Sequence, residues 1–386
     1  MILDATRNPP SQRDPRADFF RGVALWMIVV NHTPGNWLGN LTLKNFSFCD
    51  ATEAFVLLAG YAGAFAYAGL ADRSGWLVAA SALIRRIGKL YVAHIFLLVV
   101  FTAQVGFSAA ALDRATYLDE LALDPFADQP YRTLLEALLL RFQPAFLDIL
   151  PLYIVLLALF VPGLALRHRP WLLLALSIGL WVGVRAAGIN LPRWQEGGWF
   201  FNPLAWQLLF VIGFFIGQAV RGAGAPGVPP KRAWITALAI LLLGSGFVAM
   251  LAVEQVPFLG EHIPALILDF LATVDKTSLH PFRLASMLAL TYLIAHYLPR
   301  DAGVLQARWA KPLLSMGRHS LPVFCVGILL SFLIRLMLEE RDDWLMQLAA
   351  NFASIGTLVV VARLAEWQRT GGNPRPNALP AETRAA

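Results

Sequence analysis

The sequence predicts an all-α fold, a polytopic bundle of about ten transmembrane helices in a bacterial inner membrane. Hydrophobic residues make up 58% of the 386 residues and charged residues only 15%, a balance that excludes an ordinary soluble protein. The mean hydropathy of +0.59 is spread along most of the chain rather than concentrated in one segment. The apolar runs are long and unbroken instead of alternating, which favours helices over a membrane barrel.

Ten apolar runs approach the length of about 20 residues that a helix needs to cross the hydrocarbon layer. No apolar stretch precedes Phe19, so we expect no secretory signal peptide and a first run that stays in the membrane. In chain order the runs lie near residues 19–37, 53–71, 88–108, 146–165, 170–188, 203–220, 233–253, 283–298, 319–338 and 344–363.

Basic residues gather in alternate connections between these runs, which predicts that those connections face the cytoplasm. An even number of spans then places both termini in the cytoplasm. The longest outer connection ends in an apolar and charged stretch over residues 132–142, which we interpret as an amphipathic helix on the membrane surface. We expect a single transmembrane domain over residues 1–368 and a disordered cytoplasmic tail over residues 369–386.

The formal net charge of +6 does not indicate nucleic-acid binding, because the basic residues form short clusters between apolar runs and no basic domain. Cys49 and Cys325 lie on different predicted elements, so no disulfide framework is expected. The seven histidines show no zinc-ligand spacing, and no phosphate-binding glycine loop is present. We therefore expect neither a metal nor a tightly bound cofactor, and the sequence predicts no particular oligomeric state.

The first span carries polar residues that a bilayer disfavours. Asn31 and His32 interrupt it roughly 20 Å above Phe19, inside the outer half of the hydrocarbon layer. Ionisable groups at that depth indicate function by default, although a neutral imidazole hydrogen-bonded within the bundle is the structural alternative. Arg21 lies eleven positions before His32 and therefore on nearly the same helix face.

Basic residues at the cytoplasmic face form a second feature. Arg16 and Arg21 begin the first span, and Arg86 and Lys89 begin the third. Snorkelling to headgroups and the ordinary cytoplasmic excess of positive charge explain such residues equally well. Converging guanidinium groups also match phosphate oxygens, which favours a nucleotide-bearing donor on this side. His319, at the cytoplasmic start of the ninth span, either neighbours a helix cap or meets this donor.

Acidic residues open the second span. Asp50 and Glu53 have the spacing of a capping box, which explains them without any catalytic role. Because the first two spans are antiparallel, Glu53 also returns to the depth of His32, where a carboxylate can orient an imidazole and raise its basicity. Other polar residues near the outer ends of the spans are candidates for an acceptor site, each with a structural alternative: Asn36, Asp148, Trp206, Gln207, Lys276 and His280.

Several stretches, scattered in order over nearly the whole chain, resemble the OpgC family of osmoregulated periplasmic glucan succinyltransferases. They are RDPRADFFRG at 13–22, NHTPGN at 31–36, FCDATEAFV at 48–56, DILPLY at 148–153, NPLAWQ at 202–207 and GRHSLPVF at 317–324. The first span and RIGK at 86–89 also look like the wider type-3 membrane acyltransferases. That wider family usually ends this second motif in arginine, where this chain has Lys89, a residue that forms no bidentate pair.

The resemblance implies an O-succinyltransferase that moves a succinyl group from cytoplasmic succinyl-CoA to glucose hydroxyls of a periplasmic glucan. It also implies a catalytic His32. We expect the CoA phosphates on Arg16, Arg21, Arg86 and Lys89, with Asp50 or Glu53 orienting His32 and Asn31 donating to the oxyanion. Two alternatives stay open: transfer of acetyl or another acyl group to a different extracytoplasmic glycan, and a non-enzymatic glycan or lipid transporter.

Overall fold

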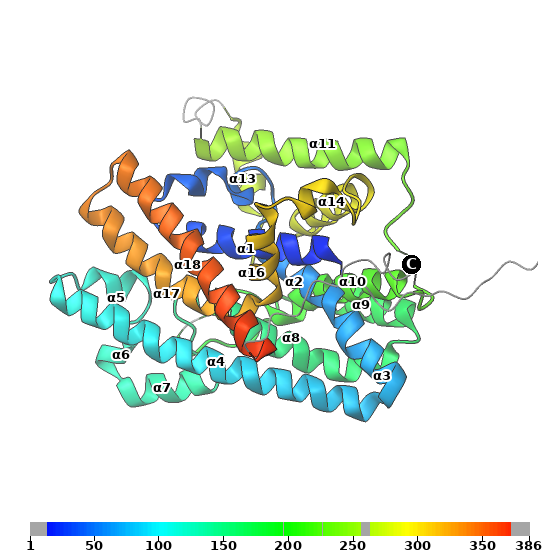
Figure 1. Ribbon diagram of the computed structural model, residues 1–386, viewed down its shortest axis with the longest axis horizontal. Helices are drawn as coiled ribbons and strands as arrows, with labels where there is room; N and C mark the ends of the chain where they lie inside the picture. The colour runs from blue at the N-terminus through cyan, green and yellow to red at the C-terminus, as the bar shows by residue number, and fades with distance from the viewer. Residues whose placement is uncertain (1–13, 196, 226, 256–262, 372–386) are drawn as a thin grey trace, which may run out of the picture.

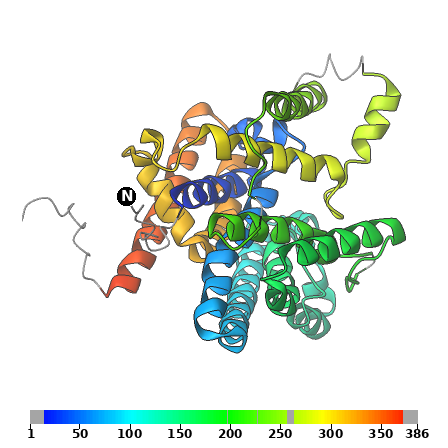
Figure 2. The same ribbon diagram turned by 90° about the vertical axis from the view of Figure 1, so that its right-hand side faces the viewer.

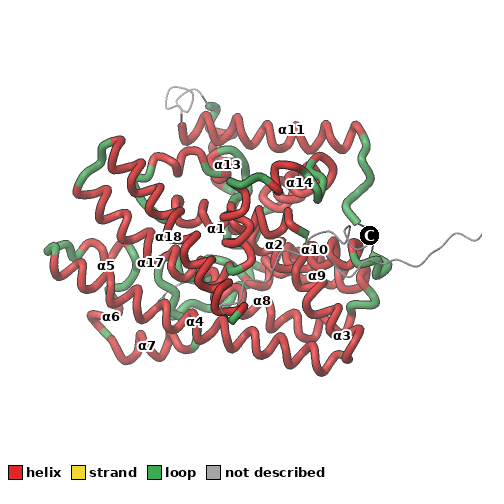
Figure 3. Tube along the Cα trace, in the orientation of Figure 1, coloured by secondary structure: helices red, strands yellow, loops and turns green. Residues whose placement is uncertain are grey.

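Helices cover all ten apolar runs of the sequence (Figure 1). The computed structural model describes residues 14–195, 197–225, 227–255 and 263–371. Within these ranges the only β-pairing is an isolated bridge between Pro192 and Gly198, and all other regular structure is helical (Figure 3). The predicted all-α class is confirmed. Of the predicted tail at 369–386, residues 372–386 lie outside the described ranges.

The helices that cover the ten runs are α1 (Pro15–Asn31), α2 (Ala51–Gly63) continued by η3 (Ala64–Ala68) and α3 (Gly69–Ser74), α4 (Trp76–Ala111), α8 (Ile149–Gly163) continued by η4 (Leu164–Leu166), α9 (Pro170–Ala187), α10 (Pro203–Val220), α11 (Ala233–Met250) continued by η5 (Leu251–Gln255), α14 (Pro281–Tyr297), α17 (Ser320–Glu340) and α18 (Trp344–Thr370). Seven of them begin and end within about three residues of the predicted boundaries. The other three differ more: α4 begins twelve residues before the predicted residue 88, α1 ends at residue 31 instead of 37, and α18 continues seven residues beyond 363.

Eight of these helices, among the described residues, are long and apolar enough to cross a membrane. The chain is therefore a multi-pass membrane protein. The other two, α1 and α14, have 17 residues each and reach about 25 Å, somewhat less than a hydrocarbon core of about 30 Å. Ten spans and two cytoplasmic termini stay predictions.

Shorter helices fill the connections between the long ones. They are η1 (Trp37–Leu41), η2 (Leu43–Asn45), α5 (Thr116–Glu120), α6 (Pro125–Asp128), α7 (Pro130–Leu138), α13 (Ala265–Ala272), α15 (Gly303–Gln306) and α16 (Ala310–Arg318). Helix α7 covers most of the predicted amphipathic stretch. It buries Thr133, Glu136 and Ala137 against the protein and leaves its larger apolar residues exposed, as expected for a helix on lipid. The exposed residues are Tyr131, Leu134, Leu135 and Leu138.

Glycines let two helix pairs approach closely. A Cβ atom on Gly60 of α2 would lie 1.9 Å from the carbonyl oxygen of Phe210 on α10, and one on Gly213 would lie 2.0 Å from that of Leu57. Helices α1 and α16 cross in the same way, because a Cβ atom on Gly22 would lie 2.0 Å from the carbonyl oxygen of Leu313. Small residues that allow backbone contact are a common way to join helices in a membrane.

Helix α1 lies in the middle of the bundle and is contacted by α2, α16 and α17 (Figure 1). Helix α4, the longest at 36 residues, runs along one side and packs on α8. Helix α11 lies at the edge of the bundle (Figure 2) and packs on α14, which also contacts α2. The central position of α1 puts the polar residues of the first span inside the protein rather than against lipid.

Candidate functional site

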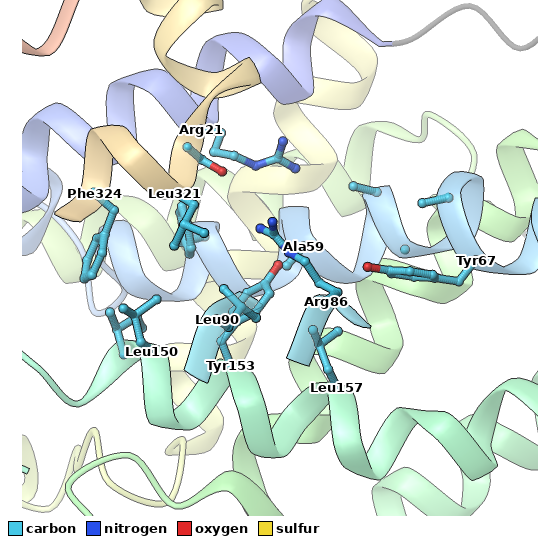
Figure 4. A pocket seen from close by; sticks show the side chains of 16 residues that line it. Arg21, Ala59, Tyr67, Arg86, Leu90, Leu150, Tyr153, Leu157, Leu321 and Phe324 are labelled. Atoms are coloured by element: carbon cyan, nitrogen blue, oxygen red, sulfur yellow. The ribbon is translucent and has the colours of Figure 1, made fainter. Parts of the chain in front are cut away.

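Two arginines from different helices line one cavity of about 310 Å³, here called the arginine cavity. Arg21 comes from α1 and Arg86 from α4, and Figure 4 shows both side chains turned toward the same space, with Tyr67 and Tyr153 beside them. The structure thus brings together two of the arginines that the sequence predicts as a donor site. The apolar part of the wall comes from Phe55, Leu90, Leu150, Leu157, Leu321 and Phe324, among others.

The two guanidinium groups are held differently. Arg21 is held by two backbone carbonyls and a carboxylate. Its Nη2 donates to Leu58 O at 3.0 Å and its Nη1 to Gly317 O at 3.4 Å, and Nη1 also lies 3.7 Å from Asp18 Oδ1. Arg86 makes no hydrogen bond or ion pair with any residue in the described part of the chain. A permanently charged side chain that lines a cavity without a carboxylate partner favours an anionic ligand.

Arg16 and Lys89, also predicted to bind the donor, lie outside the arginine cavity. The guanidinium of Arg16 pairs with Asp14 at 2.9 Å and donates to Leu298 O at 3.0 Å. Burial alone would raise the pKa of Asp14, but hydrogen bonding and charge from Arg16 outweigh it and hold the pKa below its usual range. Lys89 is exposed and does not line the cavity. His319 is buried at the junction of α16 and α17, next to Ser320, which does line the cavity.

A second cavity, of about 410 Å³, contains the histidine of the first span and is here called the histidine cavity. Asp148, Lys276 and Arg193 line it together with His32. Of the predicted acceptor-site residues it therefore gathers Asp148 and Lys276. Its remaining wall includes Thr52, Gln143 and the aromatic rings of Phe146, Phe200 and Phe201.

His32 follows the last turn of α1, and its backbone N–H donates to Ile28 O at 3.0 Å. Its ring stacks on Phe146, with centroids 4.3 Å apart and planes 25° apart. Phe146 has a left-handed backbone with φ of +70°, a conformation that costs energy for an aromatic residue and that clusters at functional sites. The buried Nδ1 of His32 has no hydrogen-bond partner among the described residues. At this nitrogen the structure therefore does not show the structural alternative, an imidazole hydrogen-bonded within the bundle.

The two cavities share part of their walls. Ile149 of α8 and Phe324 of α17 line both the arginine cavity and the histidine cavity. Arg21 lies in the N-terminal half of α1 and His32 directly follows its last residue, so the two lie about 16 Å apart along the helix axis. The arrangement is a pair of cavities along one helix, cationic at one end and carrying an imidazole at the other.

Asp50 and Glu53 form the predicted capping box at the start of α2. The structure gives their carboxylates other partners than the expected imidazole. Glu53 accepts from Arg283 Nε at 2.7 Å and from the Asp50 backbone N–H at 2.9 Å, and Asp50 pairs with both Lys276 and Arg283. Lys276 lies just before α14 and Arg283 in its first turn, and the sequence does not place this part of the chain opposite α2.

The remaining predicted residues hold the framework. Trp206 is fully buried and its Nε1 donates to the carbonyl oxygen of Lys276 at 3.0 Å, so it positions that residue. Asn31 accepts from Thr42 Oγ1 at 2.7 Å. Three others bond to neighbouring elements and line neither cavity: Asn36 with Asn351, Gln207 with Ser177, and His280, which caps α14 at the backbone N–H of Phe282.

Comparison with known proteins adds one decisive finding. A family model described as OpgC protein matches residues 13–370, nearly the whole chain. The chain belongs to the OpgC family. No curated protein and no solved structure matches it. Membership supports an acyltransferase-type activity that modifies glucans, and the resemblance predicted from the sequence is confirmed.

The OpgC-family chain also contains site residues that the sequence analysis missed. Arg193 lies in the loop between α9 and α10, where no motif or periodicity distinguishes it. Phe146 precedes the DILPLY stretch by two residues and Tyr153 ends it, but an apolar or aromatic residue in a span is usually a packing residue. Among the described residues no group of three His, Cys, Asp or Glu side chains is arranged to hold a metal ion.

Proposed function

We propose that this OpgC-family protein transfers a succinyl group from cytoplasmic succinyl-CoA to a glucose hydroxyl of a periplasmic glucan. One observation carries the proposal: a cavity lined by Arg21 and Arg86 shares two wall residues with a cavity lined by His32. A donor with phosphates at one end and a thioester at the other fits such a pair of cavities. The acyl group and the glucan come from the family resemblance.

The donor binds with its phosphates in the arginine cavity. Guanidinium groups form bidentate, charge-assisted hydrogen bonds with phosphate oxygens, and Arg86 has no competing carboxylate among the described residues. The pantetheine arm then passes between Ile149 and Phe324, where the two cavities adjoin. Apolar walls suit an arm that carries no charge. The thioester is thereby delivered to His32 from the cytoplasmic side.

His32 acts as the general base. It takes the proton of the sugar hydroxyl while the oxygen attacks the thioester carbonyl, and the carbon–sulfur bond then breaks. The proton passes to the leaving thiolate, so the products are a sugar ester and free CoA. Stacking on Phe146 fixes the plane of the imidazole during both transfers. Asn31 directly precedes His32, and Thr42 bonds to its side-chain oxygen, so its amide nitrogen serves as the oxyanion donor. An acyl-imidazole on His32, formed before the sugar arrives, is the other route that this geometry supports.

The test is labelled succinyl transfer to glucan in membranes that carry His32→Ala. We expect transfer to fall at least about 100-fold, because general-base catalysis contributes about 10² to 10⁴ in rate. His168→Ala is the matched control, since His168 is exposed on the α8–α9 connection and lines neither cavity. If the variant is expressed normally and still transfers succinyl groups, His32 is not the catalytic base. Mass spectrometry of the glucan identifies the acyl group, because a succinyl ester adds a negative charge and an acetyl ester does not.

A further inference from the structure

We propose that Arg193 and Lys276 form a subsite in the histidine cavity that binds the free carboxylate of the acyl group. The inference rests on the proposed function and deepens it: the subsite selects dicarboxylic acyl donors over neutral ones. A succinyl group ends in a carboxylate two methylenes beyond its thioester carbonyl. When that carbonyl reaches His32, the carboxylate must lie in the same cavity, which Arg193 and Lys276 line.

Arg193 lies in the loop that follows α9, and hydrogen bonds of this loop hold it in the wall of the histidine cavity. Its backbone N–H donates to Gly197 O at 3.2 Å, and the N–H of the next residue, Trp194, donates to Arg141 O at 3.0 Å. Its side-chain Nη2 donates to Gln143 O at 2.8 Å. The Nε atom is buried and has no hydrogen-bond partner in the described part of the chain. A buried donor on a charged group without an acceptor is costly, which favours an anionic ligand beside it.

Lys276 supplies the second cation. Trp206 holds its backbone carbonyl, and its ammonium pairs with Asp50 and lies 5.4 Å from the ring centroid of Phe201. An ammonium has three N–H donors, so the pair with Asp50 leaves donors for a ligand. Lys276 is thus held on two sides and lines the cavity.

The charges of the cavity wall fit an anion. Asp148 is the one carboxylate among the lining residues, against the cations of Arg193 and Lys276. Asp148 also directly precedes the first residue of α8, where the helix dipole stabilises negative charge. The rest of the wall is largely aromatic, and a carboxylate moved there from water without partners would lose its solvation. A neutral acyl group needs no such partners.

The experiment compares two donors of equal chain length, succinyl-CoA and butyryl-CoA, with Arg193→Gln. We expect kcat/KM for succinyl transfer to fall at least tenfold and that for butyryl transfer to stay within about twofold. Arg193→Lys keeps the charge and should retain part of the preference for succinyl-CoA. Arg132→Gln is the matched control, because Arg132 packs 5.3 Å from the ring of the neighbouring Trp194 but does not line the cavity.

Two outcomes overturn the subsite. One is an equal fall for both donors in Arg193→Gln, which would mean a structural or acceptor-binding role. The other is an unchanged preference for succinyl-CoA. Failure of the proposed function can be distinguished from failure of the subsite, because in that case the unmodified protein would transfer no succinyl group. Binding of the two donors to His32→Ala protein, which cannot turn them over on the proposed mechanism, measures the preference separately: the subsite predicts that Arg193→Gln lowers affinity for succinyl-CoA alone.

Discussion

At the scale of single residues, the site divides into side chains that local sequence can indicate and side chains that it cannot. His32 and Arg21 stand out because an ionisable group in an apolar run is unusual, and both line cavities. The sequence does not indicate Arg193 and Phe146 as site residues, because their place beside His32 depends on how the loops fold. The depth of Glu53 in the membrane predicts that it lies beside the imidazole of His32. Depth alone does not reveal that the carboxylate accepts a hydrogen bond from Arg283.

Arg86 offers the sharpest test of the donor site. Arg86→Lys keeps the charge but loses the planar fork, so we expect the apparent KM for acyl-CoA to rise about tenfold with little change in kcat. The neighbouring Arg85 is exposed, bonds to Ser81 on its own helix, and lines neither cavity, so Arg85→Lys should leave KM unchanged. Steady-state kinetics at saturating acceptor make the comparison. An unchanged KM for Arg86→Lys would remove Arg86 from the donor site.

At the scale of helices, apolar runs predict well that each long helix exists, because a span must satisfy its backbone hydrogen bonds internally. They predict some boundaries poorly, since α4 begins twelve residues before its apolar run. They do not predict which helices touch. Helix α16 is short and amphipathic, was not among the predicted spans, and packs closely on α1. Its contact depends on Gly22, whose role is visible only once the partner backbone is in place.

The α2–α10 contact yields a prediction about stability. Gly60→Val puts a branched side chain where even a Cβ atom meets the Phe210 carbonyl at 1.9 Å. We expect a loss of stability of about 1–3 kcal/mol or more, seen as a lower midpoint of thermal unfolding in detergent. Gly244→Val on α11 is the control, because a Cβ atom there meets nothing within 4 Å. Equal midpoints for the two variants would contradict close packing at Gly60.

At the scale of the whole molecule, composition is sufficient to predict a multi-pass helical membrane protein, since eight described helices qualify as spans. It does not fix the exact number of spans, because α1 and α14 are short and lie partly against other helices. A one-helix error would move one terminus to the other side of the membrane.

Cysteine labelling in intact cells tests this topology. In a chain without Cys49 and Cys325, we expect Ala115→Cys to react with a membrane-impermeant maleimide. Ser74→Cys should react only after permeabilisation, because it lies beside Arg73 in a connection that the basic residues assign to the cytoplasm. Both positions are exposed, so access to reagent differs only by side. Reversed labelling would invert the predicted orientation and with it the direction of transfer.

The wall that Ile149 and Phe324 share between the cavities has an electrical consequence. On the proposed route the free carboxylate of the succinyl group starts in the cytoplasm as part of succinyl-CoA. It ends outside at the far end of a sugar ester, so each turnover moves one negative charge outward. A membrane potential that is negative inside favours this movement by about 2.3 kcal/mol per 100 mV. An apolar partition between two polar cavities concentrates that voltage over a short distance. The reaction is then electrogenic, and the energised membrane helps to drive it.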